Sequence, residues 1–152
     1  MVVKLKVKKL HPNAKIPEYQ TKGAAGFDIS GIDDGESGGA DELIENGGSK
    51  IFRTGLAFEI PENHVMLVFS RSGMGFKNNL RLANCVGVID EDYRGELLVK
   101  LTNDGMNDVS IQKDSRIAQG VILKLPEVEI EETDDLSETE RGANGFGSTG
   151  KV

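Results

Sequence analysis

The stretch VMLVFSRSG, residues 65–73, joins a short apolar run to a polar end that contains glycine. The run at 65–69 is rich in residues that favour β-structure, and short runs of this kind are typical of strands. At its end, Arg71, Ser72 and Gly73 offer a guanidinium, a hydroxyl and main-chain N–H groups, which together can bind a phosphate. The alternative is a polar turn whose arginine pairs with one of the chain's many acids.

Short β-rich runs recur along the chain. Val3, Leu5 and Val7 alternate with lysines, which indicates a half-buried strand with one wet face. Similar runs lie at 56–60, 96–101 and 121–125, whereas only 73–83 could hold a short helix. The sequence therefore predicts an all-β domain of many short strands, as a sandwich, a jelly roll or a barrel.

The domain organisation follows from length and charge. With 152 residues the chain fits one domain, which we place at residues 1–126. Residues 127–140 carry acids with no compensating base before Arg141, so self-repulsion should keep this linker extended. Residues 141–152 form a glycine-rich arm, and the acidic, glycine-rich residues 31–49 are expected to form a solvated surface loop.

Composition excludes several classes of protein. The formal net charge of −7 disfavours partners such as nucleic acid and anionic membrane. The single cysteine, Cys85, can form no disulfide within the chain and fits a reducing compartment. The N-terminus does not read as a signal peptide and no segment is long and apolar enough to cross a membrane, so we expect a cytoplasmic protein.

The possible chemistry is narrow. The two histidines, His11 and His64, lie in turns and near no serine or cysteine nucleophile in the sequence, which disfavours a Ser–His–Asp site. Metal sites built from imidazole or thiolate also lack ligands. Carboxylates, arginines and glycine turns remain. They suit a phosphate ester handled with an oxygen-preferring cation such as Mg²⁺.

The stretch NCVGVIDEDYRGE, residues 84–96, predicts a β-hairpin with its apex at the acids. Asp90 follows an apolar run directly and is the candidate general base, because an ordinary aspartate is ionised at neutral pH. The alternative is a solvated turn, the usual place of a run of charges. Tyr93 could fill the core or present its ring to a sugar. Downstream, Arg116 and Gln119 precede an apolar strand.

Taken in order, these stretches resemble the five motifs of the homotrimeric dUTP diphosphatase (dUTPase) family. The resemblance covers nearly the whole chain, through residues 24–29, 70–74, 87–95, 116–119 and 141–150. It implies a β jelly roll that forms a homotrimer with active sites shared among three chains, and a mobile C-terminal arm that closes over each site. The implied reaction is hydrolysis of dUTP to dUMP and pyrophosphate by water attack on the α-phosphate. That reaction keeps uracil out of DNA and supplies dUMP for dTMP synthesis.

The resemblance also implies roles for single residues. Asp90 would activate the water, Asp28 would reach Mg²⁺ through water, and Arg116 would be a structural ion-pair partner. Phe146 would lie over the uracil ring and Tyr93 against the deoxyribose. The base and sugar would be bound by Asn84, Gly87, Val88, Ile89, Tyr93, Leu98 and Phe146, and the phosphates by Arg71, Ser72, Gly73, Gln119, Arg141, Gly147, Ser148 and Thr149.

Two alternatives stay open at this point. One is a dCTP deaminase on the same fold, although no second acid is placed to attack a cytosine ring. The other is a dUTPase-like protein that binds nucleotide mainly to control a protein partner. Two positions depart from the family pattern, since Asn144 stands where many relatives have glycine and Ser70 where proline is frequent.

Overall fold

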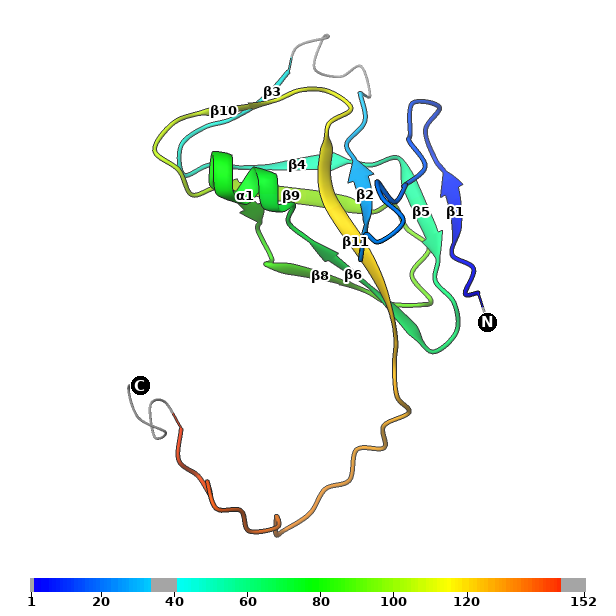
Figure 1. The fold of residues 1–152 in the computed structure, drawn as a ribbon, viewed down its shortest axis with the longest axis vertical. Helices are drawn as coiled ribbons and strands as arrows, with labels where there is room; N and C mark the ends of the chain where they lie inside the picture. The colour runs from blue at the N-terminus through cyan, green and yellow to red at the C-terminus, as the bar shows by residue number, and fades with distance from the viewer. Residues whose placement is uncertain (1, 34–40, 146–152) are drawn as a thin grey trace.

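A computed structural model describes residues 2–33 and 41–145 of the chain (Figure 1). Apart from one short helix, the regular elements of this part are all strands, which confirms the all-β prediction. Its elements are β1 (Lys6–Lys9), β2 (Phe27–Ser30), β3 (Glu42–Ile44), β4 (Ser49–Arg53), β5 (Leu56–Glu59), β6 (His64–Phe69), α1 (Ser72–Asn78), β7 (Leu80–Leu82), β8 (Val86–Ile89), β9 (Leu98–Asn103), β10 (Val109–Ile111) and β11 (Arg116–Lys124).

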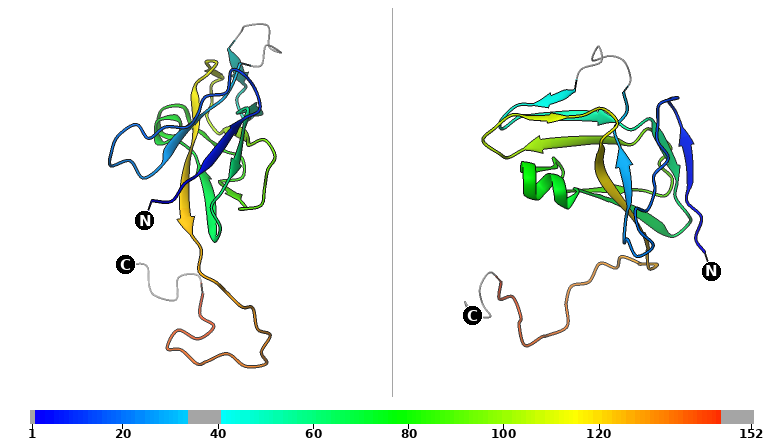
Figure 2. Two further views of the ribbon diagram at one scale, coloured as in Figure 1. Left: turned by 90° about the vertical axis from the view of Figure 1, so that its right-hand side faces the viewer. Right: turned by 45° about the horizontal axis from the view of Figure 1, so that its top comes forward.

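The strands form a jelly roll of antiparallel sheets, as the family resemblance implies. One sheet has four strands in the order β2-β11-β6-β8, and a second has three in the order β4-β9-β7. Two further antiparallel pairs, β1 with β5 and β10 with β3, complete the body. Figure 2 shows these sheets wrapped around a shared interior. Completely buried side chains fill that interior, including Ile29, Leu56, Met66, Leu101 and Ile117.

The register of β6 fixes what lies at each end of the four-stranded sheet. At one end Phe69 pairs with Gln119 on β11 and with Val86 on β8. Gln119 in turn pairs with Asp28 on β2, so four strands contribute to one transverse row. Towards the other end Met66 pairs with Ile89. The register is well specified because Met66 and Val68 face the core, and a one-residue slip would turn both outwards.

The segment at 84–96 differs from the predicted hairpin. The strand β8 pairs with β6, whereas β9 pairs with β4 and β7 in the other sheet. Leu97 is the reason: its N–H donates to the carbonyl of Leu56 at 2.8 Å, and its own carbonyl accepts from the Thr54 hydroxyl at 2.7 Å. The turn therefore delivers the returning chain to the second sheet, and local sequence carries no sign of these distant partners.

The region expected to be a solvated loop is also partly wrong. Residues 42–44 form β3, and the side chain of Ile44 is buried in the core. The strand β3 has only three residues, so its alternation of polar and apolar side chains is too short to be recognised within an acidic, glycine-rich stretch. Residues 34–40 of the same region lie outside the described residues.

After β11 the described chain leaves the body, up to residue 145 (Figure 1). Residues 127–145 are all exposed and form no helix or strand, as the run of acids predicts for an extended linker. Among the described residues, no helix has the length and apolarity required to cross a membrane.

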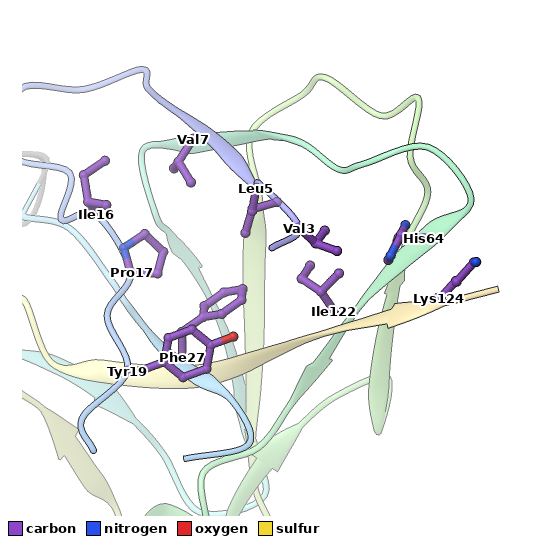
Figure 3. Close-up of a pocket in the computed structure, with 10 residues that line it drawn as sticks. All are labelled: Val3, Leu5, Val7, Ile16, Pro17, Tyr19, Phe27, His64, Ile122 and Lys124. Carbon is purple, nitrogen blue, oxygen red and sulfur yellow. The ribbon is translucent and has the colours of Figure 1, made fainter. Parts of the chain in front are cut away.

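An apolar pocket of about 510 Å³ lies beside β1 (Figure 3). Val3, Leu5 and Val7 line one wall, and Phe27 and Ile122 lie opposite them. The pocket contains none of the residues predicted to bind substrate. A strand is expected at residues 3–7, but β1 begins only at Lys6. Lys6 pairs with Glu59, the last residue of β5, so the residues before Lys6 lie beyond the end of that strand.

Gly120 generates a stability prediction, because a Cβ there would lie 2.5 Å from the buried ring of Phe27. Gly120→Ala should lower the free energy of unfolding by about 1–3 kcal/mol through overpacking, as measured by urea denaturation. The control is Gly23→Ala, where a Cβ would meet nothing within 4 Å. Equal midpoints for the two variants would contradict this packing.

Candidate active site

An ion cluster lies near the transverse row of paired residues that contains Gln119. It consists of Asp28 on β2, Arg71 just before α1 and Arg116 on β11. The Asp28 carboxylate accepts from Arg71 Nε at 3.0 Å and from Arg116 Nη1 at 2.9 Å. Arg71 Nη1 also donates to the main-chain oxygen of Arg116 at 3.0 Å. The Asp28 side chain is only 14% exposed, so these contacts offset the cost of burying its charge. The prediction that Arg116 is a structural ion-pair partner is confirmed.

Ser70 and Gln119 hold the end of β6 in place. The Gln119 amide donates to the Ser70 carbonyl at 2.9 Å, and the Ser70 hydroxyl accepts from the Leu82 N–H at 2.8 Å. Serine at this position thus bonds to β7 in a way that proline could not. The chain turns from here into α1, where Ser72 and Gly73 are exposed.

A cavity of about 590 Å³ opens beside this cluster. Its charged lining residues are Lys15, Arg71, Lys113, Asp114 and Arg116. Lys15 pairs with Asp114 and Lys113 with Asp33, whereas the two arginines share the single charge of Asp28 and leave a net positive charge beside the cavity. Arg71 uses Nε and Nη1 in the contacts above and carries further N–H donors that could reach an anion. The arrangement fits the predicted phosphate role of Arg71.

Asp90 lies at the other end of the sheet. It is exposed, directly after β8, and its carbonyl accepts from the Tyr93 N–H at 3.2 Å to close the turn. The Arg94 guanidinium braces the turn by donating to the Glu91 carbonyl at 2.6 Å. The Tyr93 hydroxyl donates to the Glu96 carbonyl at 3.0 Å. Its ring lies over Gly95, where a Cβ would come within 2.4 Å of the hydroxyl oxygen.

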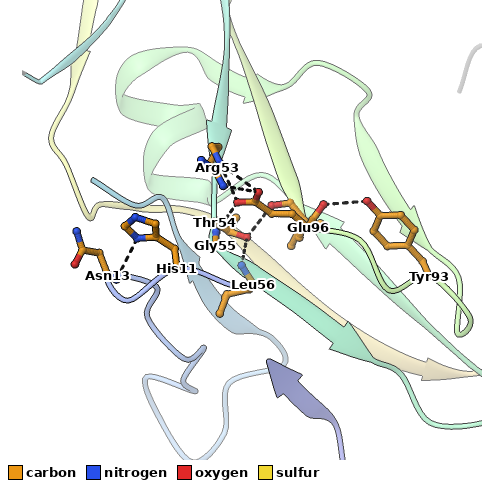
Figure 4. Close-up of polar contacts among 9 residues, drawn as sticks. His11, Asn13, Arg53, Thr54, Gly55, Leu56, Tyr93 and Glu96 are labelled. Atoms are coloured by element: carbon orange, nitrogen blue, oxygen red, sulfur yellow. Dashed lines mark hydrogen bonds and ion pairs between the residues drawn. The ribbon is translucent and has the colours of Figure 1, made fainter. Parts of the chain in front are cut away.

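Glu96 is a functional candidate that the sequence did not reveal (Figure 4). Its carboxylate accepts from both Nε and Nη2 of Arg53, and from the Gly55 N–H at 2.8 Å. These contacts tie the end of the Tyr93 turn to the junction of β4 and β5. The only sign in the sequence was that Glu96 directly follows a glycine in a stretch expected to turn. Its partner Arg53 lies 43 residues away, so the sequence does not show the contact.

The residues predicted to bind the base lie on or near β8. Gly87 is buried, and a Cβ there would lie 3.2 Å from the Val68 side chain and 3.8 Å from the Asn84 amide nitrogen. Val88 and Leu98 are half exposed or more, and Ile89 packs on the core. No hydrogen bond described for residues 84–98 joins Leu98 to β8. The structure thus brings Asn84, Gly87, Val88 and Ile89 together, with Leu98 on the neighbouring sheet.

Asp90 and Arg71 are far apart within one chain. The Ile89–Met66 and Phe69–Val86 pairs lie three residues apart along β6. Asp90 lies one residue beyond the first pair, and Arg71 lies two residues beyond the second pair in the opposite direction. The two backbones are therefore about six residues apart along the strands, or roughly 20 Å at about 3.3 Å per residue. The predicted general base and the predicted phosphate ligands therefore do not form one site within a single chain.

The described residues offer no direct site for a metal ion. They contain no group of three His, Cys, Asp or Glu side chains that could hold one. Both carboxylate oxygens of Asp28 already accept from arginines. A cation here would have to take most of its ligands from substrate and water, in keeping with the predicted indirect role of Asp28.

Arg81 supports the segment that leads into Asn84. It donates to the carbonyls of Leu82 and Ala83, and its hydrogen bond to Asp104 raises the pKa of the guanidinium above its ordinary value. At the end of β5, the hydrogen bond from Lys6 lowers the pKa of Glu59. Neither residue is among those predicted to touch substrate.

The C-terminal residues can be placed only in part. Arg141 is exposed, and its carbonyl accepts from the Asn144 N–H at 3.2 Å. Asn144 therefore completes a turn at the start of the arm. The predicted ligands Phe146, Gly147, Ser148 and Thr149 lie outside the described residues.

Comparison with known proteins places this geometry in context. The model of the dUTPase family matches residues 12–150. A deoxyuridine 5'-triphosphate nucleotidohydrolase of Nautilia profundicola is 48% identical, over 98% of this chain and 100% of its own length. One from Wolinella succinogenes is 44% identical, with 98% and 95% covered. The solved dUTPase of Staphylococcus bacteriophage 80alpha with dUPNHPP superposes with a TM-score of 0.84 at 30% identity, covering 97% of this chain and 98% of that one.

Asp28 provides a second stability prediction. Asp28→Asn removes the charge that two arginines share and should lower the free energy of unfolding by about 2 kcal/mol, measured by urea denaturation. Asp104→Asn is the control, because its ion pair with Arg81 is about half exposed and should contribute little. If both variants unfold at the same urea concentration, the Asp28 cluster does not stabilise the fold.

Proposed function

The chain belongs to the dUTPase family, and we infer that its two separated groups of site residues meet between subunits of a homotrimer. It hydrolyses dUTP. The observation that carries the shared site is the separation of roughly 20 Å between Asp90 and Arg71 along β6 and β8. A closed symmetric ring would bring the β8 end of one subunit to the Arg71 cluster of the next.

Asp90 acts as the general base in this mechanism. Its carboxylate stands exposed at the end of β8, where it can orient a water molecule and remove its proton. The water attacks the α-phosphorus, and pyrophosphate leaves. The main chain of Asp90 is held by the turn that Tyr93 and Arg94 close, which fixes where the carboxylate starts from before substrate arrives.

The uracil base binds along β8 and the segment before it. Main-chain groups of Gly87, Val88 and Ile89, with the Asn84 amide, read the edge of the base. A narrow slot of this kind rejects thymine by a steric clash with its methyl group. It rejects cytosine because donor and acceptor are exchanged and buried groups lose their partners. Leu98 closes the slot, and Tyr93 lies against the deoxyribose.

The phosphates bind at the Arg71 cluster of a neighbouring subunit. Arg71, Ser72 and Gly73 lie where β6 leads into α1, and Gln119 lies on β11, where it pairs with Phe69 at the end of β6. Arg71 also lines the cavity. Mg²⁺ is the proposed cofactor. Its ligands would be phosphate oxygens and water, with Asp28 reached through water, and when bound it neutralises phosphate charge.

The arm then closes the site. The exposed linker at 127–140 is long and acidic enough to carry Arg141 away from its own body. In this proposal Arg141 binds the outer phosphates, Phe146 covers the uracil, and the backbone of Gly147, Ser148 and Thr149 approaches the terminal phosphate. Substrate contacts offset the entropy lost when the arm becomes ordered. We place the reaction in the cytoplasm, which the single cysteine favours.

A substrate panel tests the function and separates it from its alternatives. Purified protein with Mg²⁺ should release pyrophosphate from dUTP and far less from UTP, dTTP or dCTP, measured by a coupled pyrophosphate assay and chromatography of the products. Ammonia released from dCTP would identify a deaminase instead. Nucleotide binding without turnover would favour the regulatory alternative.

Asp90 can be tested by a single atom change. Asp90→Asn keeps the shape of the side chain but removes the proton acceptor, so kcat should fall by roughly 10²–10⁴-fold while dUTP still binds. Asp92→Asn is the control, since it alters an exposed acid of the same turn. Comparable kcat values for the two variants would remove Asp90 from the role of base.

A further inference from the structure

We propose that Glu96 is a positioning residue for Tyr93 and thereby sets the preference for deoxyribose over ribose. The inference rests on the proposed function, which places Tyr93 against the sugar. The structure supplies a chain of contacts from Arg53 and Gly55, through Glu96, to the Tyr93 hydroxyl (Figure 4).

The position of Tyr93 depends on the main chain of Glu96. The Tyr93 hydroxyl donates to the Glu96 carbonyl at 3.0 Å, which is the side-chain hydrogen bond described for Tyr93. Its ring lies so close over Gly95 that a Cβ there could not be accommodated without moving the ring. The residue as a whole is nevertheless 45% exposed, so neighbouring side chains do not enclose it. Movement of the Glu96 carbonyl would therefore move the Tyr93 ring.

The Glu96 side chain is anchored far more firmly than an ordinary surface acid. It is 18% exposed, and the planar Arg53 guanidinium donates to both of its oxygens, from Nε to Oε1 at 3.3 Å and from Nη2 to Oε2 at 3.1 Å, a geometry that strengthens an ion pair. It also accepts from the Gly55 N–H at 2.8 Å. Gly55 has a φ of +65°, and its carbonyl accepts from the Leu10 N–H at 2.7 Å. Gly55 is thus held through its N–H by Glu96 and through its carbonyl by Leu10, so the point to which Glu96 is anchored is itself fixed.

A second set of contacts keeps the chain folded when Glu96 is altered. Leu97 donates to the Leu56 carbonyl, and the buried Thr54 hydroxyl donates to the Leu97 carbonyl. These bonds join the returning chain to the second sheet without the Glu96 carboxylate. The Leu97 N–H lies in the same planar peptide unit as the Glu96 carbonyl, so its bond to Leu56 is a pivot for that carbonyl. Loss of the carboxylate should therefore leave β9 in place and let the Tyr93 turn tilt about this pivot.

Sugar discrimination is sensitive to such loosening. A wall excludes one added hydroxyl only if it cannot yield, because a displacement of a fraction of an ångström creates the required space. The Tyr93 wall would yield less while the Glu96 carboxylate and the Leu97 N–H together hold the Glu96 carbonyl, which accepts from the Tyr93 hydroxyl. The Glu96 contacts should therefore affect UTP and dUTP differently, whereas a purely structural role would affect both alike.

Kinetics of Glu96→Ala test the proposal. The ratio of kcat/KM for dUTP to that for UTP should fall about tenfold, mainly through KM, with the melting temperature little changed. Glu96→Gln keeps an acceptor for the Gly55 N–H and should recover part of the ratio. Glu59→Gln is the matched control, because it removes another Lys/Arg–Glu pair, on β5. A Glu96→Ala ratio equal to that of the control would overturn the proposal.

A double-mutant cycle locates the effect at Tyr93. In a Tyr93→Phe background the hydroxyl is already absent, so Glu96→Ala should change the ratio by no more than about twofold. An undiminished effect in that background would show that Glu96 does not act through Tyr93.

Fluorine NMR tests the same link without activity. The chain has two tyrosines, so fluorotyrosine labelling gives two resonances, and Tyr93→Phe assigns them. Glu96→Ala should shift or broaden the Tyr93 resonance and leave that of Tyr19 unchanged. An unmoved Tyr93 resonance overturns the positioning role. If the wild type does not hydrolyse dUTP, the proposed function fails and this spectrum alone decides whether Glu96 positions Tyr93.

Discussion

The register of β6 between β11 and β8 is the constraint on which the site depends. It places Gln119 and the Arg71 turn at one end of the sheet and Asp90 at the other. Because core side chains alternate along β6, this register cannot slip without exposing Met66 and Val68. The separation of the proposed base from the proposed phosphate ligands is therefore built into the fold, and it is the reason that we propose a site shared between subunits.

Local charge would allow an acidic chain to hold a triphosphate at the proposed site. Asp28 pairs with both Arg71 and Arg116, so the Arg71 guanidinium is oriented before an anion arrives and the cluster keeps a net positive charge. At about 4 Å and an effective dielectric near 20, one opposite charge contributes roughly 4 kcal/mol of Coulomb energy. The diffuse negative surface is screened beyond about 8 Å at physiological salt, so nearby arginines dominate.

Sequence patterns predicted the structural features that depend on residues close together in the chain. Apolar alternation identified most of the longer strands, and a strand followed by Ser, Arg and Gly indicated the Arg71 turn. Contacts between distant segments could not be predicted in this way. The hairpin at 84–96 was wrong because Leu97 bonds to Leu56 and Thr54, and β3 was hidden in an acidic stretch. Glu96 escaped notice for the same reason, since Arg53 lies on another strand.

Subunit mixing tests the shared site most directly. Asp90→Asn and Arg71→Met proteins, each nearly inactive alone, are unfolded together, refolded and assayed for pyrophosphate release from dUTP. If one subunit supplies the base and another the phosphate ligand, mixed trimers contain some intact sites and activity should rise well above the sum of the parents. Activity that stays at that sum, although mixed trimers are seen by native mass spectrometry, would contradict a site shared between subunits.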